Sequence, residues 1–282
     1  MFHRLKLQPV IRRIPLFTLH RLPPLVNCRR FSFTSSANMR LVKIEDGESF
    51  SLVEFIGNNT PPYAILSHTW GPDGDEVSFR DLVNHTGNDK SGYTKIEFCA
   101  RRASADGLQY FWVDTCCIDK SSSAELTEAI NSMFQWYRNA AKCYVYLSDV
   151  SVYDFNQADP LRKSVFLRCR WFSRGWTLQE LIAPSKVEFF SHEGEPLGDK
   201  RSLEKEIIEA TEINVLALRG YPLSTFTVAD RISWAAKRTT TRVEDNAYCL
   251  LGIFGVYMPL IYGEGRRAFT RLIEEVNKPS KG

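Results

Sequence analysis

"LQYFWVDTCCIDKSSSAELTEAINSMFQWYRNAAKCYVYLSDV", residues 108–150, places two apolar runs on either side of an amphipathic segment. The runs at 109–114 and 143–147 are rich in aromatic and β-branched residues, which favours strands. Between them, apolar residues recur at helical spacing, and Ser122 followed by Glu125 predicts a capping box at the start of a helix. A strand, a helix and a second strand in this order predict a parallel pair joined by a crossover helix.

The same alternation continues on both sides of this stretch. An apolar run at 63–67 follows two prolines and predicts a strand, and residues 93–107 have apolar positions at helical spacing. Further along, residues 173–183 have the pattern of a helix that stops before Pro184, and residues 186–190 have that of a strand. Near-continuous apolar strands that alternate with amphipathic helices predict a parallel sheet covered by helices on both faces.

Only helical patterns follow the last of these strands. Residues 245–256 are strongly apolar and predict a buried helix, whereas residues 266–278 carry apolar side chains at i, i+3, i+4 and i+7. The "YGEGRR" segment at 262–267 predicts a turn that enters the last helix rather than a phosphate-binding loop. We therefore expect an α/β domain at 39–198 and, at 199–282, a helical extension packed on its core.

Residues 1–38 form a basic leader. Nine of the 36 basic residues precede the first acidic one, Glu45, so the body of the chain has 27 basic against 33 acidic residues and a net charge of −6. The basic excess therefore does not indicate nucleic-acid binding. Two interpretations of the leader stay open: a mitochondrial transit peptide, or a disordered or mispredicted extension ahead of a working start at Met39, with the protein cytoplasmic.

Several classes of site lack their motifs. The chain has seven cysteines and no CxxC pair, which indicates buried free thiols in a reducing compartment. The sequence contains no HExxH motif, no Walker loop and no GxSxG elbow, so we expect no metal ion and no nucleotide loop or serine hydrolase of these types. No apolar run reaches the roughly 18 residues of a transmembrane helix.

Carboxylates collect where the predicted strands end. Asp114, Asp119 and Asp149 follow strands, and Glu180 lies on the last helix of the sheet unit. Ligands of open α/β sheets bind beyond the carboxyl ends of the strands, so this group favours a ligand site. Taken singly, each carboxylate is more often a helix cap or a surface ion.

Four stretches resemble the fungal HET (heterokaryon incompatibility) domain: "YAILSHTWG" at 63–71, "EVSFRDL" at 76–82, residues 92–150, and "RCRWFSRGWTLQELIAPSKVEFF" at 168–190. Residues 230–269 resemble the segment that commonly follows this domain. The resemblance implies a toxic effector of fungal non-self recognition, a form of innate immunity that ends in programmed cell death. It also implies self-association and regulatory incompatibility proteins as partners.

The HET family is considered similar to TIR domains, which implies a flavodoxin/TIR-like parallel sheet flanked by helices, with the helical extension at its C-terminus. Many TIR domains carry a serine, a tryptophan and a glutamate on one helix, and Ser173, Trp176 and Glu180 match that pattern. Thr177 departs from it, since TIR domains often have cysteine there. In enzymatic TIR domains the glutamate cleaves NAD, so the resemblance implies Glu180 as a catalytic residue and NAD as substrate rather than cofactor.

The implied chemistry suits a single carboxylate. Glycosidases commonly need two carboxylates, one of which protonates the leaving oxygen. Nicotinamide leaves from a pyridinium that already carries positive charge, so one carboxylate can suffice to stabilise the cationic ribosyl centre. The residues expected to bind substrate are Ser67, His68, Trp70, Asp114 and Trp176, with backbone amides after Ser67 holding phosphates and Trp176 forming a stacking wall.

Three alternatives stay open. Trp176 is at least as well explained as a core anchor, and Glu180 as a helix cap or a partner of Arg174. The same surface can instead serve a non-enzymatic signalling or oligomerisation module. A hydrolase that uses Cys116 with His68 is a third interpretation, which the spacing does not demand.

Overall fold

The computed structural model describes residues 38–45, 49–57, 59–155 and 159–278. The interpretations of the leader concern residues that, apart from Asn38, lie outside this part. These described residues belong to one compact unit. No helix within the described ranges combines the length and the apolar content required to cross a bilayer.

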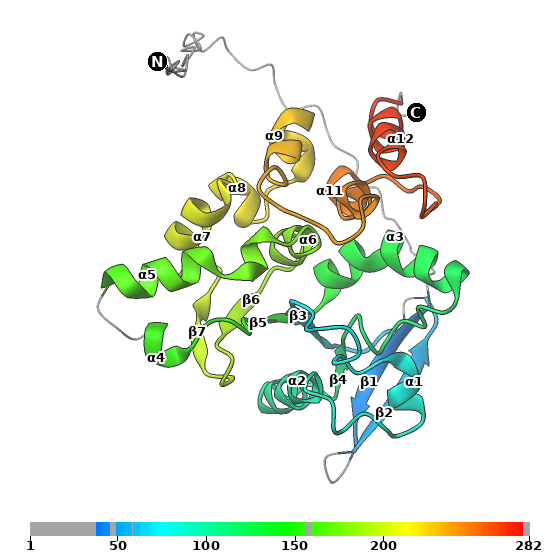
Figure 1. Cartoon of the computed structure of the whole chain (residues 1–282), viewed down its shortest axis with the longest axis vertical. Helices are drawn as coiled ribbons and strands as arrows, with labels where there is room; N and C mark the ends of the chain where they lie inside the picture. The colour runs from blue at the N-terminus through cyan, green and yellow to red at the C-terminus, as the bar shows by residue number, and fades with distance from the viewer. Residues whose placement is uncertain (1–37, 46–48, 58, 156–158, 279–282) are drawn as a thin grey trace, which may run out of the picture. The chain divides into compact units, whose positions relative to one another are not determined.

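A mixed sheet forms the centre of the described part (Figure 1). In chain order its strands are β1 (Met39–Ile44), β2 (Phe50–Phe55), β3 (Ala64–His68), β4 (Tyr110–Trp112), β5 (Lys142–Tyr146), β6 (Val187–Phe190) and β7 (Pro196–Asp199). The strands lie side by side in the order β2-β1-β4-β3-β5-β6-β7. The pairs β4–β3, β3–β5 and β5–β6 are parallel, whereas β2–β1, β1–β4 and β6–β7 are antiparallel.

The parallel strands follow a flavodoxin-like order, which confirms the predicted fold class. Counted along the chain, β3, β4, β5 and β6 are the first to fourth parallel strands, and in space the second lies beside the first, followed by the third and fourth. This is the beginning of the doubly wound 2-1-3-4-5 arrangement. Ligands of such sheets bind beyond the carboxyl ends of the first and third strands, here β3 and β5.

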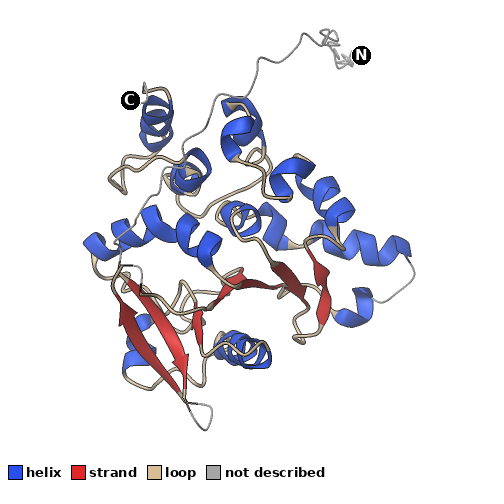
Figure 2. Ribbon diagram, turned by 180° about the vertical axis from the view of Figure 1, so that it is seen from behind, coloured by secondary structure: helices blue, strands red, loops and turns tan. Residues whose placement is uncertain are grey.

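Helices cover both faces of the parallel strands, as Figures 1 and 2 show. The crossover helix α2 (Tyr93–Ala105) lies on one face, and α3 (Ser123–Asn139) and α6 (Thr177–Ile182) lie on the other. This division follows because the β3–β4 crossover moves along the sheet in the opposite direction to the other two, and parallel crossovers are right-handed. The remaining elements of this part are α1 (Phe79–Val83), α4 (Val152–Phe155), α5 (Asp159–Arg168) and the 3₁₀ turn η1 (Arg170–Ser173).

The predicted capping box of α3 is only half formed. The Ser122 hydroxyl accepts from the backbone N–H of Glu125 at 3.3 Å. The Glu125 carboxylate accepts instead from the backbone N–H of Asp119 at 2.7 Å and pairs with Arg40 on β1. A tertiary ion pair thus takes the side chain that the local motif assigned to the N-cap.

The antiparallel edge strands were not predicted. β1 and β2 contain both buried and partly exposed positions, and their sequences, "MRLVKI" and "FSLVEF", lack the continuous apolar character of the central strands. β7, "PLGD", contains a proline and a glycine, both of which are depleted in strands. These strands depend on pairing with a finished sheet rather than on their own propensity.

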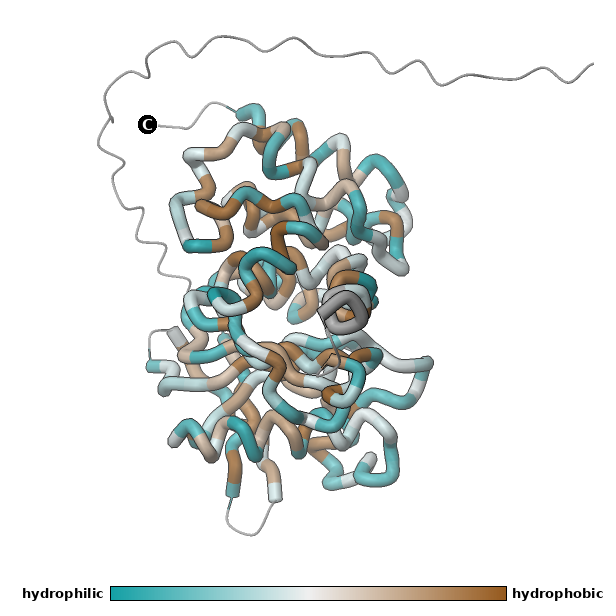
Figure 3. Tube along the Cα trace, turned by 90° about the vertical axis from the view of Figure 1, so that its left-hand side faces the viewer, coloured by the Kyte–Doolittle hydropathy of each residue, from teal (hydrophilic) through white to brown (hydrophobic). Residues whose placement is uncertain are grey.

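Short helices form the extension after β7. They are α7 (Glu204–Thr211), α8 (Val215–Leu218), the 3₁₀ turn η2 (Leu223–Thr225), α9 (Val228–Ser233), α10 (Asp245–Tyr248), α11 (Leu251–Phe254) and α12 (Arg267–Val276). α11 packs against α3 and α8 against α6, so the extension lies on the α3/α6 side of the sheet (Figures 1 and 3). Where α11 approaches α3, a Cβ on Gly252 would collide with the Phe134 side chain.

Two expectations for the extension have different outcomes. The single buried helix expected at 245–256 is wrong, since α10 and α11 are separate and Gly255, with φ of 67°, ends α11. The "YGEGRR" turn is confirmed. The backbone N–H groups of Gly263 and Gly265 both donate to Oε1 of Glu244, at 2.8 and 3.0 Å, so a carboxylate of the chain itself occupies these donors.

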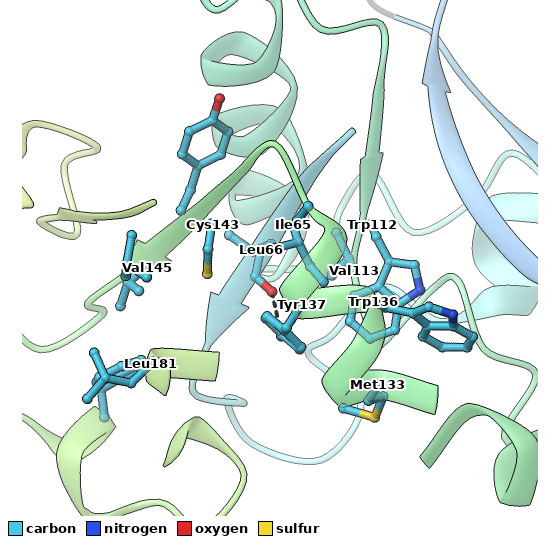
Figure 4. Packing of buried hydrophobic residues seen from close by; sticks show 14 of the residues in the cluster. Ile65, Leu66, Trp112, Val113, Met133, Trp136, Tyr137, Cys143, Val145 and Leu181 are labelled. Atoms are coloured by element: carbon cyan, nitrogen blue, oxygen red, sulfur yellow. Dashed lines mark hydrogen bonds between the residues drawn. The ribbon is translucent and has the colours of Figure 1, made fainter. Parts of the chain in front are cut away.

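Part of the core lies between the sheet and the α3/α6 layer (Figure 4), and buried residues of α2 extend it on the other face. Trp112 of β4 packs against Trp136 and Tyr137 of α3, and the Tyr137 hydroxyl donates to the carbonyl of Leu66 at 3.0 Å. This buried hydroxyl is therefore satisfied without interrupting the strand. The free buried thiols expected from the sequence are confirmed for the cysteines in the described part, which are Cys99, Cys116, Cys117, Cys143, Cys169 and Cys249.

Candidate active site

A buried serine–glutamate pair lies at the carboxyl end of β3. Ser67 is the penultimate residue of β3, and Glu180 projects from α6; they are 0% and 6% exposed. The Ser67 hydroxyl donates to Oε2 of Glu180 and accepts from the indole N–H of Trp171 at 2.8 Å. A hydrogen-bonded path therefore runs from Trp171 through Ser67 to Glu180, at the sheet edge where this fold class binds ligands.

Burial dominates the electrostatics of Glu180. It raises the pKa of this carboxyl to about 8, and the negative charge of Asp114 adds to the increase. The hydrogen bond from Ser67, the nearby Tyr137 hydroxyl and the positive charge of Arg238 act in the opposite direction. At neutral pH the carboxyl is therefore mostly protonated, and a nearby positive charge would favour its ionised form.

His68 follows Ser67 on β3, and its side chain lies among charged groups, which include Glu76, Asp114 and Lys95. Its Nε2 lies 3.8 Å from both Oε2 of Glu76 and Oδ1 of Asp114, outside hydrogen-bond distance. Neither ring nitrogen has a hydrogen-bond partner among the described residues, although the side chain is buried. Burial, with the charge of Lys95, lowers the pKa of the imidazole, so His68 is neutral at pH 7 and retains one free donor and one free acceptor.

Trp70 lies on the solvent-exposed side of Asp114. It is 46% exposed, and its indole N–H donates to Oδ2 of Asp114 at 3.0 Å. The ammonium group of Lys120 lies 3.8 Å from the centre of the Trp70 ring and 3.8 Å from the same carboxylate oxygen. Asp114 thus connects the exposed aromatic ring to the buried His68.

The turn before α6 is held by the extension. The backbone N–H of Gly175 donates to the carbonyl of Thr239 at 2.9 Å, and the N–H of Thr239 donates to the carbonyl of Ser173 at 2.7 Å. These bonds replace the helical ones, so the helix predicted from residue 173 begins at Thr177 instead. A Cβ on Gly175 would collide with Thr240, which explains the glycine at this contact.

The three residues of the serine–tryptophan–glutamate pattern consequently have different surroundings. Ser173 is exposed in η1, and its hydroxyl donates to the carbonyl of Arg170 at 2.8 Å. Trp176 is half-buried at the N-cap of α6 and hydrogen-bonds through its side chain to Asp245 of α10, which also accepts from the Tyr262 hydroxyl at 3.0 Å. Glu180 alone of the three takes part in the pair with Ser67.

Among the predicted site residues, the structure therefore joins Ser67 to Glu180 and Trp70 to Asp114, and it places His68 near Asp114 without a hydrogen bond. The tryptophan that reaches Ser67 is Trp171, which the sequence did not single out. Trp171 and Trp176 both lie in "RWFSRGW", and the spacing to Glu180 led to the prediction that Trp176 belongs to the site.

Two other expectations concern competing chemistry. Hydrogen bonding to Cys117 and burial raise the pKa of the Cys116 thiol well above its usual value, which disfavours a thiolate nucleophile at that position. Arg174, the alternative partner of Glu180, donates from Nη2 to the Thr241 hydroxyl at 3.3 Å. No group of three His, Cys, Asp or Glu side chains in the described ranges is arranged to hold a metal ion.

Comparisons with known proteins identify similar sequences. Residues 63–164 match the family model described as "Heterokaryon incompatibility protein (HET)". The chain is 58% identical over 244 residues to "Vegetative incompatibility protein HET-E-1" of Podospora anserina, and the match covers 85% of this chain. The chain spans only 18% of that relative's length, and no solved structure matches it. The family model and the relative together show that the chain is a HET-domain protein, a member of the heterokaryon incompatibility family.

Proposed function

We propose that this chain is an effector of heterokaryon incompatibility that causes cell death by cleaving NAD between nicotinamide and ribose. The observation that carries the proposal is the buried Glu180 carboxyl, hydrogen-bonded to Ser67 at the carboxyl end of β3. A desolvated carboxyl at the ligand edge of a doubly wound sheet is a candidate reacting group. The TIR-like serine–tryptophan–glutamate pattern supports the same assignment.

The electrostatics suit a cationic substrate. In the free protein, burial keeps Glu180 mostly protonated at pH 7, since it raises the pKa of the carboxyl to about 8. A pyridinium ring bound beside Glu180 lowers that pKa again, because an opposite charge favours the ionised form. Binding of the substrate thus generates the carboxylate that the reaction needs.

The reaction then balances without a cofactor. The bond between the ribose C1′ and the pyridinium nitrogen breaks, and both of its electrons go to nicotinamide. The Glu180 carboxylate stabilises the oxocarbenium-like ribosyl centre, with Ser67 holding the carboxylate in place. Water adds its oxygen to C1′ and releases one proton, which gives nicotinamide and ADP-ribose.

Neighbouring residues supply complementary binding groups. The exposed ring of Trp70 offers a stacking surface for a base, with Asp114 fixing its orientation. The free ring nitrogens of His68 can bond to ribose hydroxyls or phosphate oxygens. Trp176, which hydrogen-bonds to Asp245, holds α6 against the extension and contributes through the position of Glu180.

The depth of the pair favours one competing function. Glu180 and Ser67 are nearly inaccessible to solvent. In the competing function, the chain is a signalling module that acts by self-association, and the pair has the structural role of fastening α6 to β3. In that module no NAD is consumed, and toxicity depends on a surface that joins copies of the chain.

Expression of the full chain in a fungal host separates the two functions. We expect the parent chain to deplete cellular NAD before viability falls and Glu180→Gln to do neither. A matched control is Glu188→Gln, which alters a half-buried glutamate on β6 that pairs with Lys142 and should remain toxic. Toxicity that persists in Glu180→Gln without NAD loss would refute the enzymatic proposal and support the signalling module.

A further inference from the structure

A buried arginine of the extension lies close to the α6 turn. Arg238 follows α9 and is 7% exposed. Its Nη1 donates to the Thr177 hydroxyl at 2.7 Å and to the carbonyl of Arg174 at 2.9 Å, and its Nε donates to the carbonyl of Trp234 at 3.3 Å. Its Nη2 has no hydrogen-bond partner among the described residues. A desolvated guanidinium with an unused donor requires a physical explanation.

Thr177 connects Arg238 to the serine–glutamate pair. The Thr177 hydroxyl, which accepts from Arg238, donates to the carbonyl of Trp171 at 2.6 Å. The Trp171 indole in turn donates to Ser67, whose hydroxyl donates to Glu180. The contacts therefore form one continuous path from the extension, through the turn before α6, to the buried carboxyl.

Charge provides a second link between the same two residues. Burial lowers the pKa of the Arg238 guanidinium to about 10, and Glu180 is among the groups whose negative charge counteracts this decrease. The other titratable or hydrogen-bonding groups that face Glu180 are Ser67 from β3, Asp114 after β4, Tyr137 from α3 and Cys143 from β5. Arg238 is the cation named among the strongest influences on Glu180.

We propose that Arg238 is the positioning residue of the Glu180 site: it orients the Trp171–Thr177 turn and provides the counter-charge for the ionised carboxylate. The site is therefore shared between the α/β domain and the extension. This inference rests on the proposed function for the role of Glu180 in the reaction.

The direct test is a pH titration of the Glu180 side-chain carboxyl by ¹³C NMR on the full chain, assigned with Glu180→Gln. We expect Arg238→Gln to raise the titration midpoint by about one pH unit, because the ionised form loses its counter-charge. Arg238→Lys keeps the charge and should leave the midpoint close to that of the parent. A merely structural arginine would not produce this difference between the two variants.

Arg231→Gln is the matched control. Arg231 is a partly buried arginine of α9 whose Nη1 donates to the carbonyl of Ile253 at 3.2 Å and whose guanidinium lies 4.6 Å from the Phe254 ring centre. Its contacts remain within the extension, so its loss should weaken packing there and leave the Glu180 midpoint unchanged. An equal shift in Arg231→Gln and Arg238→Gln would overturn the proposal, as would no shift in a folded Arg238→Gln.

Thr177→Val supplies the test if Arg238→Gln does not fold. It removes the hydroxyl that links Arg238 to Trp171 and leaves the cation in place. We expect the indole N–H resonance of Trp171 to move, and an unchanged resonance would contradict the path. None of these measurements requires turnover, so a chain that does not cleave NAD refutes the proposed function without deciding the role of Arg238.

Discussion

A carboxyl group that is removed from water must give up its charge or be matched by donors and cations. Glu180 accepts from Ser67 and has the positive charge of Arg238 near it, yet burial still raises its pKa to about 8. The group is thus held close to the point at which a modest change of environment ionises it. We regard that balance, rather than the presence of a glutamate on α6, as the chemical property of the site.

The stability of the protein should depend on pH through this group. The pKa of Glu180 is about 8 in the folded state and near 4.5 when exposed, so the folded protein binds more protons between these values. Its contribution to the free energy of unfolding is complete below about pH 4 and decreases by about 1.4 kcal/mol per pH unit as the pH rises toward 8. Urea denaturation at pH 6 and pH 8 should show a smaller loss for Glu180→Gln than for the parent. Equal losses in the two proteins would contradict the assignment.

Trp70→Ala separates substrate binding from folding. Trp70 is 46% exposed, so we expect little change in the melting temperature. Loss of the stacking surface should raise KM for NAD about tenfold, since such contacts contribute about 1–2 kcal/mol. Steady-state kinetics decide the matter, and an unchanged KM would remove Trp70 from the binding surface.

At the scale of elements, the close approach of α11 to α3 depends on Gly252, where a Cβ would collide with Phe134. Gly252→Ala should lower the free energy of unfolding by about 1–3 kcal/mol through overpacking. In the control Gly71→Ala, the new Cβ meets its nearest neighbour, Asp75, at an ordinary 3.6 Å. Urea titrations that find the two substitutions equally mild would show that the helices can move apart at little cost.

The central strands and long helices were predictable because each carries its own pattern. β3 and β5 are almost entirely buried and read as continuous apolar runs, and α3 has one apolar stripe. β1, β2 and β7 depend on a neighbouring strand, and the start of α6 depends on backbone bonds to Thr239, far along the chain. The sequence of a single segment does not predict partners that lie elsewhere in the chain.

The candidate site was predictable in part for the same reason. Ser67, His68 and Asp114 follow directly from the rule that ligands bind where parallel strands end. Trp171 and Arg238 could not be identified in this way, because their roles arise from contacts that join positions more than 60 residues apart. Trp176 was assigned from its spacing to Glu180, and the fold directs its hydrogen bond to Asp245 instead.

For the molecule as a whole, the structure indicates that the α/β part and the extension depend on each other. The extension covers Phe134 of α3 through Gly252 and supplies Arg238 to the turn before α6. A chain truncated after residue 198 should therefore lose its cooperative thermal transition and bind a hydrophobic dye such as ANS. A truncated chain that melts cooperatively near the temperature of the full chain would show that the two parts fold independently.

The most direct test of the account is the release of nicotinamide by the purified full chain. NAD would be incubated with the parent protein, Glu180→Gln and the control Glu188→Gln, and the products separated by chromatography. We predict equimolar nicotinamide and ADP-ribose from the parent and from Glu188→Gln, and at least a hundredfold slower release from Glu180→Gln, about the loss expected when one electrostatic stabiliser is removed. Equal rates in the parent and Glu180→Gln, or no release by the folded parent at any protein concentration, would contradict the central claim.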